Sequence, residues 1–208
     1  MKKYFPILLN LQNKKCLVVG GGAVAQRKIE NILDTGVKIK CVSIEFTDDL
    51  LALLKQNSIE YYKRPFEISD LDDMDIVFAA TNDSEINKQI YQECEKRKIL
   101  INVVDNPQIC TFIVPAIINR GDLTIAVSTS GKFPGLSKKI RKEIEKKYGN
   151  FYTEYLEIIS EIRNKIIQLN LKEEEKKEKI EKLLDLDILA LIENGKLKEA
   201  RKKAEKII

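Results

Sequence analysis

The sequence predicts an α/β fold built on a parallel β-sheet, and two observations support this. Short apolar runs alternate with amphipathic helical patterns through the first half of the 208-residue chain. This alternation is typical of βαβ units, in which a helix connects neighbouring parallel strands. One run, DIVFAAT at residues 75–81, is almost wholly apolar, as expected for a strand buried on both faces of a sheet.

Residues 14–105 contain the alternating elements. The first helical pattern ends at Gly36, and the second begins at Thr47, a favoured N-cap residue followed by acidic residues. The third begins at an Asn-Asp pair. The expected strands are residues 14–20, 37–43, 59–66, 75–81 and 99–105, and the expected helices are residues 23–36, 46–57 and 82–98.

After Asp105 the pattern changes. Two β-rich runs joined by the turn signal NRGD predict an antiparallel hairpin over residues 112–130, followed by a helix from Pro134. The remaining chain is Lys- and Glu-rich with apolar residues at helical spacing, and its run KEEEKKEKIEK is expected to be a solvated helix face. We therefore expect three parts: a sheet domain at 1–111, a hairpin-plus-helix segment at 112–149 and a small helical domain at 150–208.

Composition excludes several classes of protein. The net charge of +4 is too small to indicate a nucleic-acid binder, and no apolar run approaches the ~20 residues of a membrane span. The N-terminal stretch lacks a small-residue cleavage site, so a cytoplasmic protein is expected. With no histidine and no C-x-x-C pair among the four cysteines, we expect no metal site, and Cys16 and Cys41 are interpreted as buried small apolar residues.

Three consecutive glycines carry the strongest functional signal. Gly20, Gly21 and Gly22 follow an apolar strand and open a helix, and Ala25 occupies the third small position of the dinucleotide-binding motif. Such glycines allow a tight turn and a close approach of pyrophosphate to the helix N-terminus. A Rossmann-like, dinucleotide-binding sheet is the favoured interpretation, and a merely tight strand-to-helix turn is the alternative.

Two further strand ends should face the cofactor. Ser43 stands where the second strand should meet the ribose, with Glu45 two residues on; Glu45 would repel a 2′-phosphate, which favours NAD over NADP. Thr81, Asn82 and Asp83 follow the fourth strand. They are candidate cofactor contacts or helix-capping residues, and the two roles can coexist.

Several segments together resemble precorrin-2 dehydrogenase, the stand-alone counterpart of the dehydrogenase/ferrochelatase module of siroheme synthase. The resemblance covers roughly residues 4–148, and the helical remainder matches only in being helical. The segments are FPILLNLQNKKCLVVGGGAVAQRKIENIL, FAATND, NVVDNPQICTFIVPAII and LTIAVSTSGKFPGLSKKIR.

The resemblance implies NAD-dependent oxidation of precorrin-2 to sirohydrochlorin, by a homodimer whose middle β segment forms much of the dimer contact. In some relatives, insertion of Fe²⁺ follows. The resemblance also places cofactor contacts on Ala23, Val24, Ile44 and Glu45, and the family's functional aspartate on Asp105.

The residues themselves agree with this role for Asp105. Oxidation of a tetrapyrrole to a more conjugated state removes a hydride and a proton, and without histidine a carboxylate at the fifth strand end is the best-placed proton acceptor. The alternative is that Asp-Asn-Pro only initiates a turn.

Precorrin-2 carries many carboxylates, so its site should offer positive charge and hydrogen-bond donors. The hairpin and the following helix supply a group of candidates, each of which could also be ordinary surface polarity. The candidate substrate-binding residues are Arg120, Ser128, Thr129, Lys132 and Lys138.

The hairpin is apolar on both faces, which predicts that a second copy covers it in a homodimer.

Two other classes of function remain open. One is an NAD-binding redox sensor without catalysis, and the other is an interaction protein that acts through its charged C-terminal helices.

Overall fold

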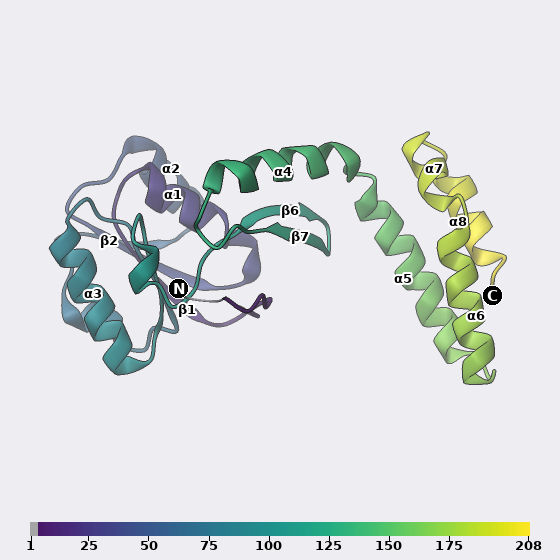
Figure 1. Ribbon diagram of the computed structural model, residues 1–208, viewed down its shortest axis with the longest axis horizontal. Helices are drawn as coiled ribbons and strands as arrows, with labels where there is room; N and C mark the ends of the chain where they lie inside the picture. Colours follow the sequence, from purple (N-terminus) through teal and green to yellow (C-terminus); the bar gives the residue numbers. More distant parts are fainter. Residues whose placement is uncertain (1–3) are drawn as a thin grey trace. The chain divides into compact units, whose positions relative to one another are not determined.

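The computed structural model describes residues 4–208 (Figure 1), which divide into two compact units, one reaching to Val114 and the other spanning Pro115–Ile208. The first unit holds a five-stranded parallel sheet with the order β3-β2-β1-β4-β5. The predicted α/β fold class is therefore confirmed. The elements of this unit are β1 (Lys15–Val19), α1 (Ala23–Glu30), β2 (Lys38–Ser43), α2 (Asp48–Gln56), β3 (Glu60–Lys63), β4 (Ile76–Ala79), α3 (Ser84–Arg97) and β5 (Leu100–Val103).

Two helix ends differ from the sequence expectation. The helix expected over residues 23–36 ends at Glu30, and a short 3-10 turn over Leu33–Thr35 completes the connection up to Gly36. Gly36 has a φ of 73°, a left-handed conformation that suits glycine and reverses the chain. Thr47 does precede α2, but its side chain makes no capping hydrogen bond.

The sheet buries apolar side chains on both faces because neighbouring residues of a strand point in opposite directions. Leu17 and Val19 of β1 pack on one face, while Cys16 and Val18 pack on the other, against Ala25 and the rest of α1. All four cysteines are buried, and for Cys16 and Cys41 this agrees with their interpretation as small core residues.

The second unit contains the predicted hairpin and a set of helices. Its hairpin pairs β6 (Ala116–Arg120) with β7 (Leu123–Val127), and α4 (Pro134–Lys147) packs against both strands. A separate core forms where Ile158, Ile162 and Ile166 meet the helices that follow. Those helices are α5 (Tyr152–Gln168), α6 (Glu173–Asp185), α7 (Ile188–Glu193) and α8 (Leu197–Glu205).

The Lys- and Glu-rich run lies on α6 with most of its side chains exposed, as predicted. The boundary between the two compact units, after Val114, falls inside the predicted middle segment 112–149. The predicted division into three domains stays a prediction. Across residues 4–208, no helix combines the length and the apolar character needed to cross a membrane.

Candidate functional site

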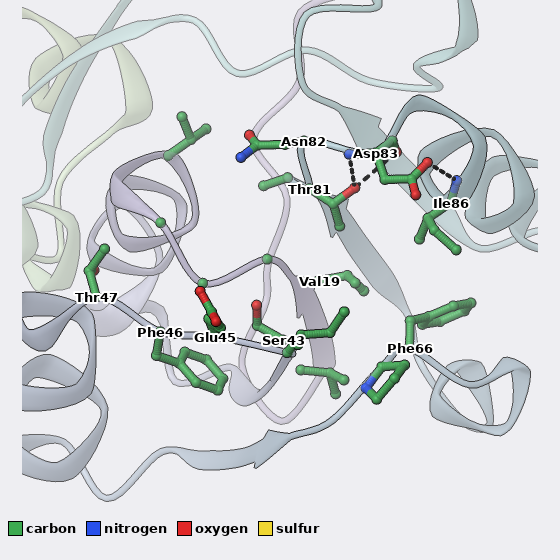
Figure 2. Close-up of a pocket in the computed structure, with 18 of the residues that line it drawn as sticks. Val19, Ser43, Glu45, Phe46, Thr47, Phe66, Thr81, Asn82, Asp83 and Ile86 are labelled. Carbon is green, nitrogen blue, oxygen red and sulfur yellow. Dashed lines mark hydrogen bonds between the residues drawn. The ribbon is translucent and has the colours of Figure 1, made fainter.

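A cavity of about 740 Å³ opens at the carboxyl ends of β1, β2 and β4 (Figure 2). In open parallel sheets this edge is where ligands bind. Every residue predicted to contact a cofactor lines the cavity, so the structure brings together three segments that are far apart in the sequence. These residues are Gly20, Gly21, Gly22, Ala23, Val24, Ser43, Ile44, Glu45, Thr81, Asn82 and Asp83.

The three glycines have different structural reasons to be glycine. Gly20 has a φ of 135°, and a Cβ there would overlap the carbonyl group of Ala80. A Cβ on Gly21 would overlap the carbonyl oxygen of Glu45. A Cβ on Gly22 would meet no atom within 4 Å. The fold therefore requires the first two glycines, whereas Gly22 leaves free space at the N-terminus of α1.

The N-terminus of α1 is left available to an anion. Gly22 provides no side-chain cap, and the first turn holds no acidic residue. Within residues 4–208, the N–H groups of Ala23 and Val24 donate no hydrogen bond. By contrast, α2 has Asp48 and Asp49 in its first turn. Free N–H groups and the positive end of the helix dipole attract phosphate oxygens.

The wall formed by the end of β2 suits a nucleoside. Ser43 is partly buried, Ile44 is 64% exposed despite its apolar side chain, and Glu45 is exposed. Pro65 and Phe66 line the same cavity from the chain that follows β3. An apolar surface with a few polar groups is the usual setting for a flat base and a sugar.

The segment after β4 combines capping with free polar groups. Asp83 caps α3, since its Oδ1 accepts a hydrogen bond from the N–H of Glu85 at 2.9 Å and one from the N–H of Ile86 at 3.1 Å, the second of which is visible in Figure 2. The Thr81 hydroxyl donates to Oδ1 of the buried Asn87 at 2.8 Å. The side chain of Asn82 makes no hydrogen bond to another described residue, which leaves it available to a ligand.

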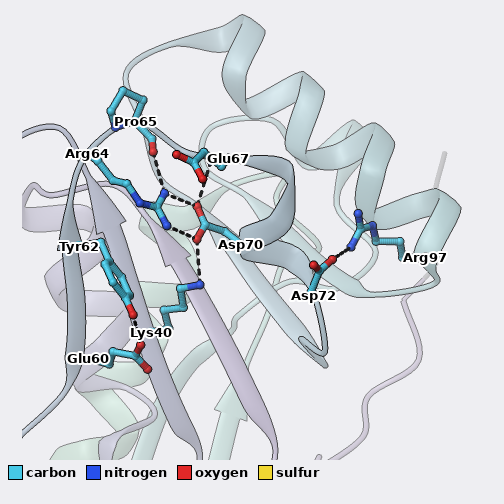
Figure 3. Close-up of polar contacts among 9 residues, drawn as sticks. All are labelled: Lys40, Glu60, Tyr62, Arg64, Pro65, Glu67, Asp70, Asp72 and Arg97. Atoms are coloured by element: carbon cyan, nitrogen blue, oxygen red, sulfur yellow. Dashed lines mark hydrogen bonds and ion pairs between the residues drawn. The ribbon is translucent and has the colours of Figure 1, made fainter.

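A buried ion-pair cluster, which the sequence analysis missed, supports the Pro65–Phe66 wall (Figure 3). The Asp70 carboxylate is 1% exposed; it accepts two hydrogen bonds from Arg64 at 2.7 and 2.8 Å and lies 2.8 Å from Nζ of Lys40. Burial raises the pKa of Asp70, but the hydrogen bonds from Arg64 and Lys40 outweigh it and hold the pKa well below its usual range.

This cluster had only a weak signal in the sequence, because Asp70 belongs to an acidic run, SDLDD, that reads as a surface turn. Arg64 directly precedes Pro65, and its guanidinium also donates to the Pro65 carbonyl at 2.9 Å. The cluster therefore fixes the backbone that carries the two wall residues.

Asp105 lies in the turn that follows β5, at the same sheet edge, although it does not line the cavity. It is exposed and has a φ of 60°, a left-handed conformation that aspartate adopts more readily than most residues. Beneath the turn, the Cys110 thiol lies 3.2 Å from the Val103 carbonyl and 3.3 Å from the Asn106 carbonyl, within hydrogen-bonding range. The turn thus presents a carboxylate on a backbone held from below.

The five predicted substrate residues lie in the second unit, and the structure separates them into two groups. Arg120 has a local partner: its Nε donates to the Tyr148 carbonyl at 2.9 Å, which ties β6 to the end of α4. Oγ1 of Thr129 accepts from the N–H of Phe133 at the start of α4, and Oγ of Ser128 accepts from the N–H of Ser130.

Lys132 and Lys138 are exposed, and neither forms an ion pair within the part of the chain that the structure describes. No group of three or more Cys, Asp or Glu side chains among residues 4–208 is arranged to hold a metal ion.

Comparison with known proteins matches both units. Residues 7–116 match a family described as "Putative NAD(P)-binding", and residues 120–147 match one described as "Sirohaem biosynthesis protein central". The chain is 33% identical over 198 residues to a siroheme synthase of Ruthia magnifica subsp. Calyptogena magnifica, and 34% identical over 205 residues to that of Thioalkalivibrio sulfidiphilus.

These alignments cover 95% and 99% of the chain but 42% of each relative, so the chain spans less than half the length of the curated relatives that it matches. Among solved structures, SirC, a precorrin-2 dehydrogenase, superposes with a TM-score of 0.78 at 27% identity, covering 98% of this chain and 100% of that one. The chain belongs to the NAD(P)-binding family that its residues 7–116 match.

Proposed function

We propose that this member of the NAD(P)-binding family uses NAD to oxidise precorrin-2 to sirohydrochlorin. The observation that carries the proposal is the start of α1, which has no side-chain cap: the free N–H groups of Ala23 and Val24 and the open space at Gly22 face a cavity at the carboxyl edge of a parallel sheet. The similarity to SirC and to siroheme synthases supports the choice of substrate.

The residues present fit a dinucleotide. The N–H groups of Ala23 and Val24 would hold the pyrophosphate, and Ile44 with Phe66 would contact the base. Asn82 would contact the part of the cofactor that reaches the end of β4. When bound, NAD supplies the hydride acceptor, and the chain supplies the binding groups and the proton acceptor.

Glu45 favours NAD over NADP in this proposal. Its carboxylate is exposed at the end of β2 and pairs with no cation among the described residues, so its charge remains to repel a 2′-phosphate. Arg64 lies near this wall but is held by Asp70, which removes the guanidinium that could otherwise have neutralised a phosphate.

Asp105 is the proposed acceptor of the substrate proton. The sequence contains no histidine, and Asp105 is an exposed carboxylate at the same sheet edge as the cavity. A carboxylate beside the bound tetrapyrrole would take the proton that the oxidation releases, while NAD takes the hydride. In the second unit, Lys132 and Lys138 remain candidates to bind substrate carboxylates. Ser128 is also a candidate, because its oxygen accepts from Ser130 while its hydroxyl can still donate to a substrate. Arg120 and Thr129 would act by holding the hairpin and α4 in place.

A homodimer is part of the proposal. The hairpin is only two strands wide, and α4 packs against it. Ile125 and Val127 on one face and Ile117 on the other stay partly exposed. A second copy would cover this apolar surface. Light scattering at micromolar concentration is expected to give the mass of a dimer, and a monomer would contradict this part of the proposal.

The decisive experiment is an anaerobic assay of the purified chain with precorrin-2 and NAD, in which the absorbance change reports the formation of sirohydrochlorin. We expect sirohydrochlorin to form with NAD and more slowly with NADP. No oxidation above a protein-free control would overturn the proposal. Sirohydrochlorin and Fe²⁺, supplied without NAD in a second reaction, test whether the chain also inserts iron, as the family resemblance predicts for some members.

A further inference from the structure

Lys28 is a partly buried cation near the candidate site to which the proposed function gives no role. It lies on α1, one turn after the cavity-lining Val24. Its Nζ lies 5.5 Å from the ring centroid of Phe78 on β4. Helical side chains generally lean toward the helix N-terminus, which in α1 is the end that carries the glycine turn.

The Lys28 ammonium has no hydrogen-bond or ion-pair partner in residues 4–208. The other partly buried cations beside this sheet differ, because Lys40 and Arg64 are both paired with Asp70. Burial lowers the pKa of Lys28 and the nearby Arg27 lowers it further. An unpaired cation costs free energy when it loses water, and its contact with the Phe78 ring offsets only part of that cost.

Asp105 and Lys28 lie near the same place on the sheet. Phe78, beneath the ammonium, pairs in register with Asn102 of β5, and Asp105 follows Asn102 by three residues. The negative charge of Asp105 attracts the Lys28 ammonium, although the two groups form no ion pair. Lys28 thus contacts β4, and Asp105 follows the neighbouring strand β5, without an ion pair between the two groups.

We propose that Lys28 binds a carboxylate of the tetrapyrrole and so positions the macrocycle against Asp105. The inference rests on the proposed function, which supplies a polycarboxylate substrate and a proton acceptor at this edge. A charge-assisted hydrogen bond to a substrate carboxylate would give the ammonium the partner that the chain itself does not provide. Lys28 would then be a substrate-positioning residue, and the Asp105 carboxylate would remain free to take the proton.

The test compares Lys28→Met, which keeps the length of the stem but not the charge, with Lys28→Arg, which keeps the charge. Lys88→Met is the matched control, because Lys88 is an exposed lysine of α3 away from the cavity lining. For Lys28→Met we expect the KM for precorrin-2 to rise about tenfold, with kcat within about twofold and NAD affinity unchanged. The KM of Lys28→Arg for precorrin-2 should stay within about threefold of the wild-type value, and the KM of Lys88→Met should equal the wild-type value.

Thermal unfolding separates this role from a structural one. Removing an unpaired, partly buried charge should leave the Tm of Lys28→Met equal to or above that of wild type. An unchanged KM for precorrin-2 in Lys28→Met would overturn the proposal. A fall in NAD affinity as large as the rise in KM would also overturn it, because Lys28 would then contact the cofactor.

A binding measurement keeps the inference separate from the proposed reaction. Uroporphyrin III, a porphyrin with eight carboxylates, serves as a probe that needs no turnover. Its affinity, followed by fluorescence quenching, should fall about tenfold in Lys28→Met and not in Lys88→Met. If wild type fails to oxidise precorrin-2 but this difference persists, the proposed function is wrong and the carboxylate site stands. Equal affinities, or no binding to wild type, would overturn the site.

Discussion

The turn after β1 and the turn after β5 end at the same edge of one sheet, yet they are built in opposite ways. The glycine turn exposes backbone: it has no capping side chain, and Gly22 leaves open space. The turn after β5 exposes a side chain, the Asp105 carboxylate, on a left-handed backbone with a φ of 60°. In our proposal the first turn binds the cofactor and the second acts on the substrate.

The difference shows which kind of site a short sequence motif can identify. Backbone N–H groups at a helix start are set by local geometry, so three glycines after a strand are informative by themselves. A side-chain site depends on what other elements place around it. Asp105 has Lys28 of α1 nearby, and the two are 77 positions apart in the sequence.

The largest expected effect on activity comes from the turn after β5. Asp105→Asn keeps the shape of the side chain and removes its basicity, so the rate of sirohydrochlorin formation should fall by about 10² or more. NAD affinity, measured by calorimetry, should stay within about twofold because the glycine turn is unchanged. A rate near that of wild type would mean that solvent takes the proton and that Asp105 serves only the turn.

The glycine turn should show the reverse pattern. Gly22→Asp places a negative charge where the pyrophosphate would bind, and NAD affinity should fall by about 30-fold or more, corresponding to about 2 kcal/mol. Its Tm should not fall, since a Cβ on Gly22 meets no neighbour.

Gly21→Ala provides the contrast, because its methyl group would overlap the Glu45 carbonyl oxygen and should destabilise the fold. If Gly22→Asp binds NAD as well as wild type, or if it loses as much stability as Gly21→Ala, the separation of the two glycine roles is wrong.

The support of the cavity wall should give the largest effect on stability, a quantity separate from rate and cofactor affinity. Asp70→Asn leaves Arg64 and Lys40 without their carboxylate and should lower the free energy of unfolding by about 3 kcal/mol. The control is Asp72→Asn, which breaks the ion pair between Asp72 and Arg97. Because the Asp72 side chain is 65% exposed, this substitution should lower the free energy of unfolding by less than about 1 kcal/mol. Urea unfolding of both variants measures the difference, and equal costs would contradict a special role for the buried cluster.

The same carboxylate predicts a pH dependence. Because the pKa of Asp70 is lower in the folded chain than the ordinary value of about 3.9, its contribution to stability is complete above that value and is lost as the pH falls toward the folded pKa. Between about pH 5 and pH 2, wild type should therefore lose more stability than Asp70→Asn. Parallel loss in the two proteins would exclude Asp70 as the source.

The smallest expected effects lie under the two turns, where each has a buried cysteine. The Cys41 thiol lies 3.5 Å from the Gly20 carbonyl, and the Cys110 thiol lies within 3.3 Å of two carbonyls of the Asp105 turn. Cys110→Ala should lower kcat about threefold without changing NAD affinity, and Cys41→Ala should weaken NAD binding by a similar factor with kcat unchanged. Identical effects of the two substitutions on both constants would show that the turns are not independent.

The sequence alone determined the parallel sheet, the cofactor candidates and the burial of Cys16 and Cys41, because alternation of strands and helices and the special geometry of glycine are local properties. The sequence also named Asp105, which it placed at the end of a strand over residues 99–105; the structure ends β5 at Val103 and puts Asp105 in the turn that follows, and its role stays a prediction. Tertiary structure alone decided that Gly20 and Gly21 serve the fold while Gly22 is free, since the carbonyl groups that crowd the first two come from Ala80 and Glu45. It also decided that Asp70 is a buried ion-pair centre and that Lys28 is left without a partner. Burial and pairing depend on which distant elements meet, and composition and periodicity carry little information about those meetings.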